Sequence, residues 1–200
     1  DDEEIAEVAL KFGAEVPFIR PIEYASDTSL DIDVFKHLLE WLKLNENYTP
    51  ENLVHLRPTG PARCINDVDK AIEMFITNNE CDSLRSVCLS QQTPYKMWNE
   101  KNGYLSSVAI DPGIKDFHSQ PRQKLPKVYW QNGYVDIVKS NTILKLDSMV
   151  GEKCMSFICS NKTHDIDYLD DIPIVEKLLK QICNNEITSL NITDQDFHSV

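Results

Sequence analysis

The chain has 200 residues, of which 42% are hydrophobic and 26% charged, and these proportions are typical of an ordinary globular protein with a sizeable core. Its 20 Lys and Arg residues are scattered among 32 Asp and Glu, and a net charge of −12 argues against a general nucleic-acid or membrane-surface binder, which needs a basic face. No apolar run approaches the roughly 18 residues of a membrane span. Six cysteines without a CxxC pair favour reduced thiols and a cytoplasmic setting.

Apolar residues at helical spacing alternate along the chain with short apolar runs that are typical of strands. In chain order we expect a helix over about 5–12, a helix over 30–44, a strand over 52–56, a helix over 65–75, a strand over 84–89, a hairpin turn at 102–103, a strand over 134–138, a short helix over 140–147, a strand over 154–159 and a final helix over about 171–183. The polar tail, 184–200, is predicted to be loose.

This alternation predicts an α/β layered fold with a mostly parallel sheet. Ligands of such sheets bind beyond the carboxyl ends of the strands. The loops at 57–63 and 160–167 each follow an expected strand, so we expect the site there.

The sharpest local feature is His164-Asp165-Ile166-Asp167. In an extended segment the side-chain period is two, so both carboxylates emerge on one face. Such a pair can hold Mg²⁺, which prefers oxygen ligands and keeps room for waters and phosphate oxygens. The alternative is a solvated loop before a helix, in which Asp170 and Asp171 serve as capping residues.

A second feature is the proline-rich segment Arg57-Pro58-Thr59-Gly60-Pro61-Ala62-Arg63. Gly60 lets the backbone approach a ligand, and two guanidinium groups could clamp a carboxylate or a phosphate. Arg122-Gln123 followed by Asn132-Gly133 offers similar polar donors and a turn. By spacing alone, surface arginines on a strand-to-helix loop are the simpler interpretation.

Other catalytic signatures are missing from the sequence: it has no Gly-x-Ser-x-Gly, Ser-x-x-Lys, GxGxxG or GxxxxGK motif. The chain opens at Asp1 without an initiator methionine and is in helical pattern by Ile5. We therefore expect a fragment, and a nucleotide enzyme would have to supply its phosphate-binding loop from an upstream segment.

Taken together and in order, these motifs resemble the acylneuraminate cytidylyltransferase family over about 1–183. The resemblance rests on Asp1 to Ala6, on Gly13 to Pro21 with Ala25 to Thr28, on Leu56 to Arg63, on Arg122-Gln123-x-Leu125-Pro126 with Asn132-Gly133, and on Asp165-Ile166-Asp167. Each motif is short, but the ordered set is specific.

The resemblance implies a Rossmann-like nucleotidyltransferase in which a 2-keto sugar acid attacks the α-phosphorus of CTP and pyrophosphate leaves. It implies Mg²⁺, or Mn²⁺, at Asp165 and Asp167, and catalytic roles for Asp165, Asp167 and Arg122, with one aspartate also assisting deprotonation. The remaining positions that it assigns are Arg20, Ser26 and Asp27 at the cytidine, Arg57, Arg122, Gln123 and Asn132 at the sugar acid, and Thr59, Arg63 and Gly133 in the same binding loops. It also implies a homodimer formed through an insertion at 93–125.

The sequence departs from the family pattern at three points. Arg57 stands where sialic acid enzymes often carry Gln, which suggests a different nonulosonic acid, such as a legionaminic-type acid, and Gly60 and Ala62 replace Ser and Leu. The family's Gly-Ser-Lys-Gly phosphate loop is not in this chain. Two alternatives therefore stay open: a cytidylyltransferase for a 3-deoxy-manno-octulosonate-type acid, and a catalytically silent homologue that serves as a binding or dimerisation module.

Overall fold

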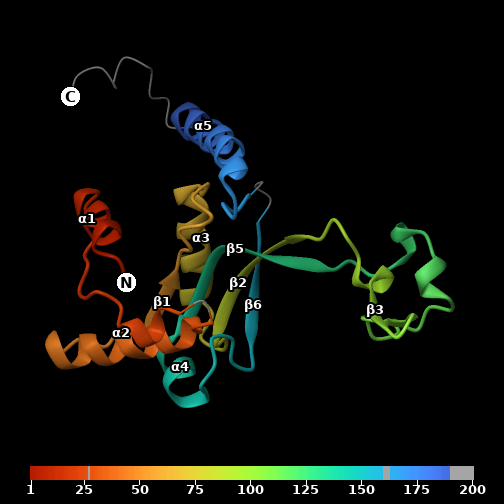
Figure 1. Cartoon of the computed structure of the whole chain (residues 1–200), viewed down its shortest axis with the longest axis horizontal. Coiled ribbons are helices and arrows are strands. Elements are labelled where there is room, and N and C mark those ends of the chain that lie inside the picture. Colours follow the sequence, from red (N-terminus) through yellow and green to blue (C-terminus); the bar gives the residue numbers. More distant parts are fainter. Residues whose placement is uncertain (27, 160–162, 190–200) are drawn as a thin grey trace. The chain divides into compact units, whose positions relative to one another are not determined.

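The structure is a computed structural model that describes residues 1–26, 28–159 and 163–189. Within these residues it has five α-helices and six strands (Figure 1). The helices are α1 (Glu3–Lys11), α2 (Asp31–Asn45), α3 (Ile65–Ile76), α4 (Ser140–Leu146) and α5 (Ile172–Ser189). The strands are β1 (Asn52–His55), β2 (Ser83–Leu89), β3 (Trp98–Lys101), β4 (Tyr104–Ser107), β5 (Tyr129–Lys139) and β6 (Cys154–Ile158).

The α/β class is confirmed, and the arrangement is consistent with a Rossmann-like fold. The prediction of a mostly parallel sheet is wrong, because the four-stranded sheet β1-β5-β2-β6 is mixed. The amide of Asp82 donates to Lys153 O and that of Cys159 to Val87 O, so the paired residue numbers increase together and β2 and β6 are parallel. By contrast, Lys139 N donates to Asp82 O and Ser90 N to Val128 O, so β5 runs antiparallel to β2.

The chain divides into two compact units, which we describe separately. Unit 1 comprises Asp1–Leu53, Glu80–Ser83 and Ile137–Cys154, and unit 2 comprises Val54–Asn79, Leu84–Asp136 and Met155–Val200. The core of unit 1 forms where α2 packs beside α4, and it buries Leu39, Leu53, Val138 and Ile143. Leu39 falls on the face of α2 that the apolar spacing of this helix predicts.

Unit 2 contains α3, α5 and most of the polar residues of the candidate site. The amphipathic α3 buries Ala71 and Phe75, and β5 buries every side chain from Tyr134 to Asp136. Between β2 and β5, the segment 93–125 carries the two-stranded β3–β4 sheet. Its Asn102-Gly103 turn has positive φ at both positions, 54° and 82°, as the predicted tight hairpin requires.

The final helix is longer than the sequence pattern predicts. We expect it to end near residue 183, yet α5 continues to Ser189. The residues after Cys183 are polar but include no Gly or Pro, so nothing in them stops helix propagation. The rest of the predicted loose tail, 190–200, lies outside the described residues.

Among the residues that the structure describes, no helix combines the length and the apolar character that crossing a membrane requires.

Candidate active site

A pocket of about 600 Å³ opens in unit 2 beside the ends of β2 and β6 and the start of β5. Its lining comes from the end of β2 and the residues after it, from the start of β5, and from the segment before α5, while residues 57–63 lie outside it. The lining residues are Cys88, Leu89, Ser90, Gln91, Gln92, Met97, Trp130, Asn132, Thr163, His164, Asp165, Asp167, Tyr168 and Asp171. The structure therefore brings three predicted site residues together here, namely Asp165, Asp167 and Asn132.

The Asp-x-Asp segment is fixed to the proline-rich loop through the backbone. Ile166 N donates to Thr59 O at 2.7 Å, while the side chains of Asp165 and Asp167 on either side of it are exposed and line the pocket. This alternation matches the two-residue period that predicts both carboxylates on one face. The contact of Thr59 with this segment is made by its main-chain oxygen.

Asp171 holds the same segment from the other side. Its Oδ2 accepts hydrogen bonds from Asp167 N at 3.0 Å and Tyr168 N at 2.8 Å, and its Oδ1 lies 2.8 Å from Nε2 of His164. The hydrogen bond from His164, followed by that from Tyr168 N, lowers the pKa of Asp171 below its ordinary value. The capping role predicted for Asp171 is thus combined with a place in the pocket wall.

Gly60 leaves space for the Asp165 carboxylate. A Cβ built at Gly60 would stand 2.9 Å from Asp165 Oδ1 and 3.5 Å from Nη2 of Arg63. A side chain here has to displace the carboxylate, so the departure from the family's Ser at position 60 affects where Asp165 can lie.

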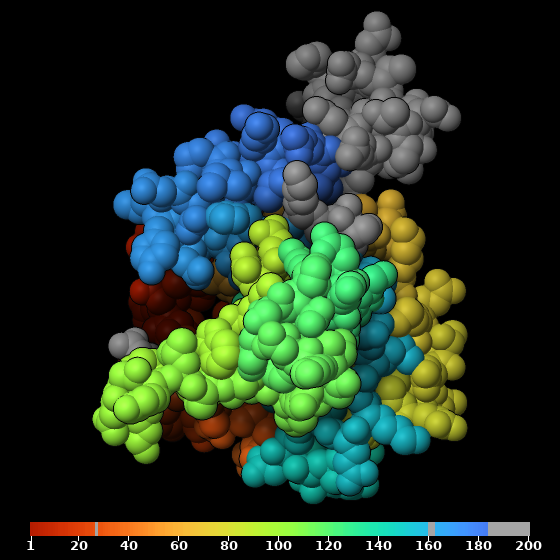
Figure 2. Space-filling view, turned by 90° about the vertical axis from the view of Figure 1, so that its right-hand side faces the viewer, coloured from red at the N-terminus to blue at the C-terminus, as the bar shows by residue number. Residues whose placement is uncertain are grey.

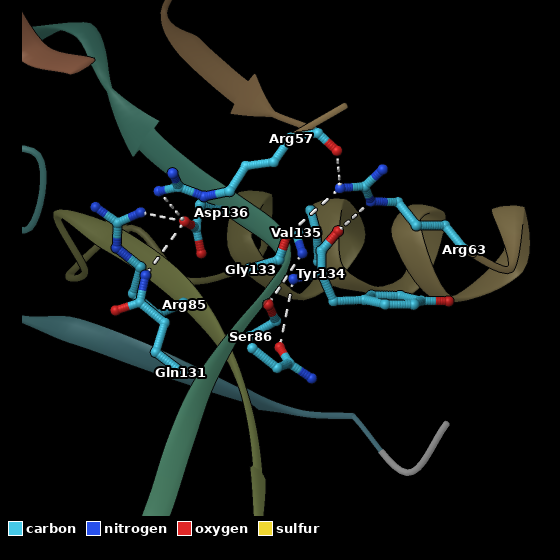
Figure 3. A network of polar contacts seen from close by, with 10 residues as sticks. Arg57, Arg63, Arg85, Ser86, Gln131, Gly133, Tyr134, Val135 and Asp136 are labelled. Atoms are coloured by element: carbon cyan, nitrogen blue, oxygen red, sulfur yellow. Dashed lines mark hydrogen bonds and ion pairs between the residues drawn. The ribbon is translucent and has the colours of Figure 1, made fainter. Parts of the chain in front are cut away.

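Three arginines and one buried carboxylate form a polar network on β5 (Figure 3). The side chain of Asp136 is only 3% exposed, and its Oδ2 lies 2.5 Å from Nη1 of Arg85 and 3.5 Å from Nη2 of Arg57. Gln131 Nε2 donates to the same oxygen at 3.4 Å. Asp136 and Arg85 have no place among the sequence-predicted site residues.

Arg63 connects the proline-rich loop to β5. Its Nε donates to Tyr134 O and its Nη2 to Arg57 O, both at 2.6 Å, and the hydroxyl of Tyr134 accepts from Cys64 N. Burial lowers the pKa of the Arg63 guanidinium, and the charges of nearby groups, including Asp165, offset part of this effect. Much of the donor capacity of Arg63 therefore goes to main-chain carbonyls, which fixes the loop that carries Arg57 and Thr59.

Asn132 and Gly133 lie in β5 shortly before Tyr134 and Asp136. Asn132 is 8% exposed, its Oδ1 accepts from Tyr134 N, and its Nδ2 has no hydrogen-bond partner in the described part of the chain. A buried amide donor without a partner is energetically costly. Its place in the wall of a pocket indicates a position where a ligand oxygen could accept its hydrogen bond. Gly133 has φ +61°, and a Cβ there would stand 3.2 Å from Cδ of Arg57.

The predicted residues Arg122 and Gln123 line a neighbouring pocket of about 480 Å³, which shares Leu89 and Ser90 with the first. Arg122 Nη2 donates to Ser90 O. Arg20 and Ser26 belong to unit 1, where Arg20 forms an ion pair with Asp1 at 2.5 Å and Ser26 forms a turn with Ser29. Asp27 lies outside the described residues.

Two carboxylates of this kind fit Mg²⁺, which is usually bound by one or two carboxylates together with waters and phosphates. Both Asp165 and Asp167 are exposed in the pocket and therefore open to such further ligands. Within residues 1–26, 28–159 and 163–189, no three His, Cys, Asp or Glu side chains form a group that could hold a metal ion. An ion held by these two aspartates therefore needs other oxygen ligands.

Comparison of the sequence with known proteins finds relatives that match most of the chain. The chain is 32% identical over 188 residues to the post-translational flagellin modification protein B of Campylobacter coli, covering 90% of this chain and 75% of that protein. It is 30% identical over 204 residues to a CMP-N,N'-diacetyllegionaminic acid synthase of Campylobacter jejuni, covering 98% and 78% of the two chains.

A pseudaminic acid cytidylyltransferase of Campylobacter jejuni is 28% identical over 182 residues, covering 90% of this chain and 75% of that enzyme. No family model matches the chain. The match to the legionaminic acid synthase covers 98% of the chain and therefore extends over both units. The chain therefore belongs to the CMP-nonulosonic acid synthetase family of CTP-dependent nucleotidyltransferases.

Proposed function

We propose that this protein transfers CMP from CTP to the anomeric hydroxyl of a nonulosonic acid of the legionaminic or pseudaminic type and releases pyrophosphate. The observation that carries the proposal is one pocket that combines two exposed carboxylates, Asp165 and Asp167, with a buried amide donor of Asn132 that has no partner in the described chain. Phosphoryl transfer depends on positioning and charge stabilisation, and this pocket has groups for both.

In the reaction, the anomeric oxygen forms a bond to the α-phosphorus while the bond to the pyrophosphate oxygen breaks. A magnesium ion bound at Asp165 and Asp167 would offset phosphate charge. The backbone hydrogen bond from Ile166 to Thr59 and the three contacts of Asp171 keep these two carboxylates in place. The amide of Asn132 donates to substrate oxygen, and Arg57 pairs with the sugar carboxylate through a planar guanidinium.

The choice of sugar acid rests on different support. The names of two of the relatives above specify N,N'-diacetyllegionaminic acid and pseudaminic acid as their substrates. In addition, Arg57 supplies a longer, cationic side chain where sialic acid enzymes often carry Gln. A 3-deoxy-manno-octulosonate-type acid is the competing substrate, and a silent binding module is the competing function.

The direct experiment incubates the protein with CTP, Mg²⁺ and one acid at a time: N,N'-diacetyllegionaminic acid, pseudaminic acid or 3-deoxy-manno-octulosonate. We expect a CMP-sugar and an equal amount of pyrophosphate with a nonulosonic acid, observed by phosphorus NMR, and little product with the octulosonate. A preference for the octulosonate would support the competing substrate. Binding of CTP without turnover of any acid would support the silent module.

We also propose a homodimer formed through the segment 93–125. An aromatic cluster orders this segment from within: Trp98 stacks on His118 at a ring distance of 4.0 Å, and Phe117 packs edge-on against Tyr95 at 6.0 Å. Tyr104 and Ile110 are 81% and 91% exposed in the segment, whose surface, coloured green, faces the viewer in Figure 2. Exposed apolar and aromatic side chains of this kind are typical of interface centres.

A cytoplasmic location is part of the same proposal. None of the six cysteines, all of which lie in the described part of the chain, forms a disulfide, and Cys81 and Cys159 are buried. Free thiols are typical of proteins in a reducing compartment. Fractionation of cells that produce the protein, followed by detection with an antibody, tests this point.

A further inference from the structure

We propose that Asp136 is a positioning residue that orients Arg57 toward the carboxylate of the sugar acid, so that this buried aspartate helps to determine which acids the enzyme accepts. The inference rests on the proposed function, in which Arg57 binds the sugar carboxylate. Asp136 itself is 2% exposed and acts through Arg57.

The first support is the burial of a charged group within the run Tyr134–Val138 of β5, in which every other residue is hydrophobic. Asp136 stands between Val135 and Ile137, which are 0% and 2% exposed. A buried carboxylate is costly unless cations and hydrogen-bond donors surround it. Replacing it with an apolar residue would often be neutral or stabilising, so a retained buried ion pair invites a functional explanation.

The second support is the unequal distance of the two arginines from the same oxygen. Arg85, with a side chain 12% exposed, lies 2.5 Å from Asp136 Oδ2, whereas Arg57, with a side chain 37% exposed, lies 3.5 Å from it. Arg85 makes the close buried contact, and Arg57 extends from the loop toward the carboxylate while remaining accessible (Figure 3). The Arg57 guanidinium is thus directed by charge and still has surface for a ligand.

The third support is the space that Gly133 leaves for the side chain of Arg57. The positive φ of Gly133 and the 3.2 Å that would separate a Cβ from Arg57 Cδ show that the stem of Arg57 lies directly against this glycine. Gly133 follows Asn132, whose amide lines the pocket. Asp136, Gly133 and Arg63, which bonds to Arg57 O, therefore hold the backbone and the side chain of Arg57 from three sides.

The experiment is a double-mutant cycle with Asp136→Asn and Arg57→Gln in the complete protein. The probes are N,N'-diacetyllegionaminic acid and its C1 carboxamide, with KM measured separately for CTP. We expect Asp136→Asn to raise KM for the acid about tenfold and to leave KM for CTP within about twofold. We expect Arg57→Gln to remove most of the preference for the carboxylate, and the double variant to resemble Arg57→Gln alone, because both changes act through one group.

Ser86→Ala is the matched control for a general disturbance of β5. Its buried hydroxyl accepts a hydrogen bond from Val135 N at 2.9 Å, next to Asp136, and carries no charge. We expect it to lower the melting temperature without separating the two KM values. If Asp136→Asn fails to fold because Arg85 is left with an uncompensated buried charge, the pair Asp136→Asn and Arg85→Gln removes both charges and takes its place.

The outcomes separate the inference from the proposed function. If Arg57→Gln keeps the preference for the carboxylate over the carboxamide, Arg57 does not bind that group, and both statements about it are overturned. If Arg57→Gln abolishes the preference but Asp136→Asn leaves KM for the acid unchanged, only the inference is overturned. Additive effects in the double variant would also overturn it, since Asp136 would then act by another route.

Discussion

Replacement of either pocket aspartate by asparagine tests the metal site most directly. Asp165→Asn and Asp167→Asn keep the shape of the side chain and remove half of the negative charge that the pair presents to a cation. Both side chains are exposed at the pocket, on a segment fixed by the Ile166–Thr59 backbone hydrogen bond. Because the hydrogen bonds that fix this segment use its backbone and Asp171, we expect little change in melting temperature.

The expected magnitude follows from the charge that is lost. At an effective dielectric constant of about 20, two unit charges about 4 Å apart interact by about 4 kcal/mol. Water that replaces the lost ligand recovers part of this energy at an exposed site, so we expect the barrier to rise by about 3 kcal/mol, which corresponds to a fall in kcat of roughly a hundredfold. The same change should weaken magnesium binding in the presence of CTP.

The assay is turnover of CTP with the preferred acid over a series of Mg²⁺ and Mn²⁺ concentrations, together with Mn²⁺ binding measured by electron paramagnetic resonance in the presence of CTP. Raising either metal should partly restore the variants. Asp170→Asn, three residues from Asp167 and outside the pocket lining, is the matched control and should behave like the wild type. Near-normal turnover in both Asp165→Asn and Asp167→Asn would refute the reasoning and place the catalytic centre elsewhere.

Three further changes have outcomes that the structure sets. Gly60→Ala should displace the Asp165 carboxylate, because its Cβ would lie 2.9 Å from Oδ1, and should raise the magnesium concentration needed for half-maximal rate several-fold with little loss of stability. Tyr104→Ser combined with Ile110→Ser should yield monomers in light scattering, and a wild-type protein that is itself monomeric at micromolar concentration would contradict the dimer. Hydrogen bonds from two backbone amides lower the pKa of Asp82 below its ordinary value of 3.8. The ionised carboxylate therefore stabilises the folded state fully above that pH, and this contribution is lost as the pH falls through the lower pKa of the folded state. Asp82→Asn should therefore lower the melting temperature at pH 7, and the difference from wild type should narrow below about pH 4, whereas a constant difference would argue against this account.

The helices and turns could be predicted from the sequence because their signals are local. The face of α3 that carries Ala71 and Phe75 shows in the spacing of its apolar residues, and the Asn102-Gly103 turn needs two residues that tolerate positive φ. The Asp-x-Asp pair could be predicted for the same reason, since its side-chain alternation depends only on an extended backbone.

Strand direction could not be predicted in this way. The run from Tyr134 to Val138 is apolar apart from one residue, and an antiparallel strand covered on both faces gives the same pattern as a parallel one. The direction of β5 depends on its long-range pairing with β2, which no local spacing records. Of the two loops that were expected to carry the site, the one after β6 contributes Thr163, His164, Asp165 and Asp167 to the pocket lining, whereas residues 57–63 lie outside that lining.

The buried network carried a signal that the motif analysis overlooked. Asp136 is the one charged residue in the otherwise hydrophobic run Tyr134–Val138, and a buried charge of this kind requires a cation or a set of donors. Its partner Arg85 lies in β2, about fifty residues earlier in the sequence, so only the pairing of the two strands brings the charges together. Conversely, Arg63 stands in a motif that suggests ligand binding, yet its geometry shows two strong contacts with main-chain carbonyls.

The distribution of charge in unit 2 explains how a strongly acidic chain can accept anionic substrates. A net charge of −12 repels a nucleotide at long range, but salt screens that field beyond about 8 Å. Inside that distance Arg57, from the loop after β1, and Arg85, from β2, lie beside Asp136, while Asp165 and Asp167 line the pocket. Arg63 couples the two groups, because its guanidinium interacts with both Asp165 and Asp136. On this arrangement a triphosphate approaches the carboxylates only together with a cation, whereas a sugar carboxylate can be held by Arg57 without one, so removal of magnesium should abolish CTP binding before it affects binding of the acid.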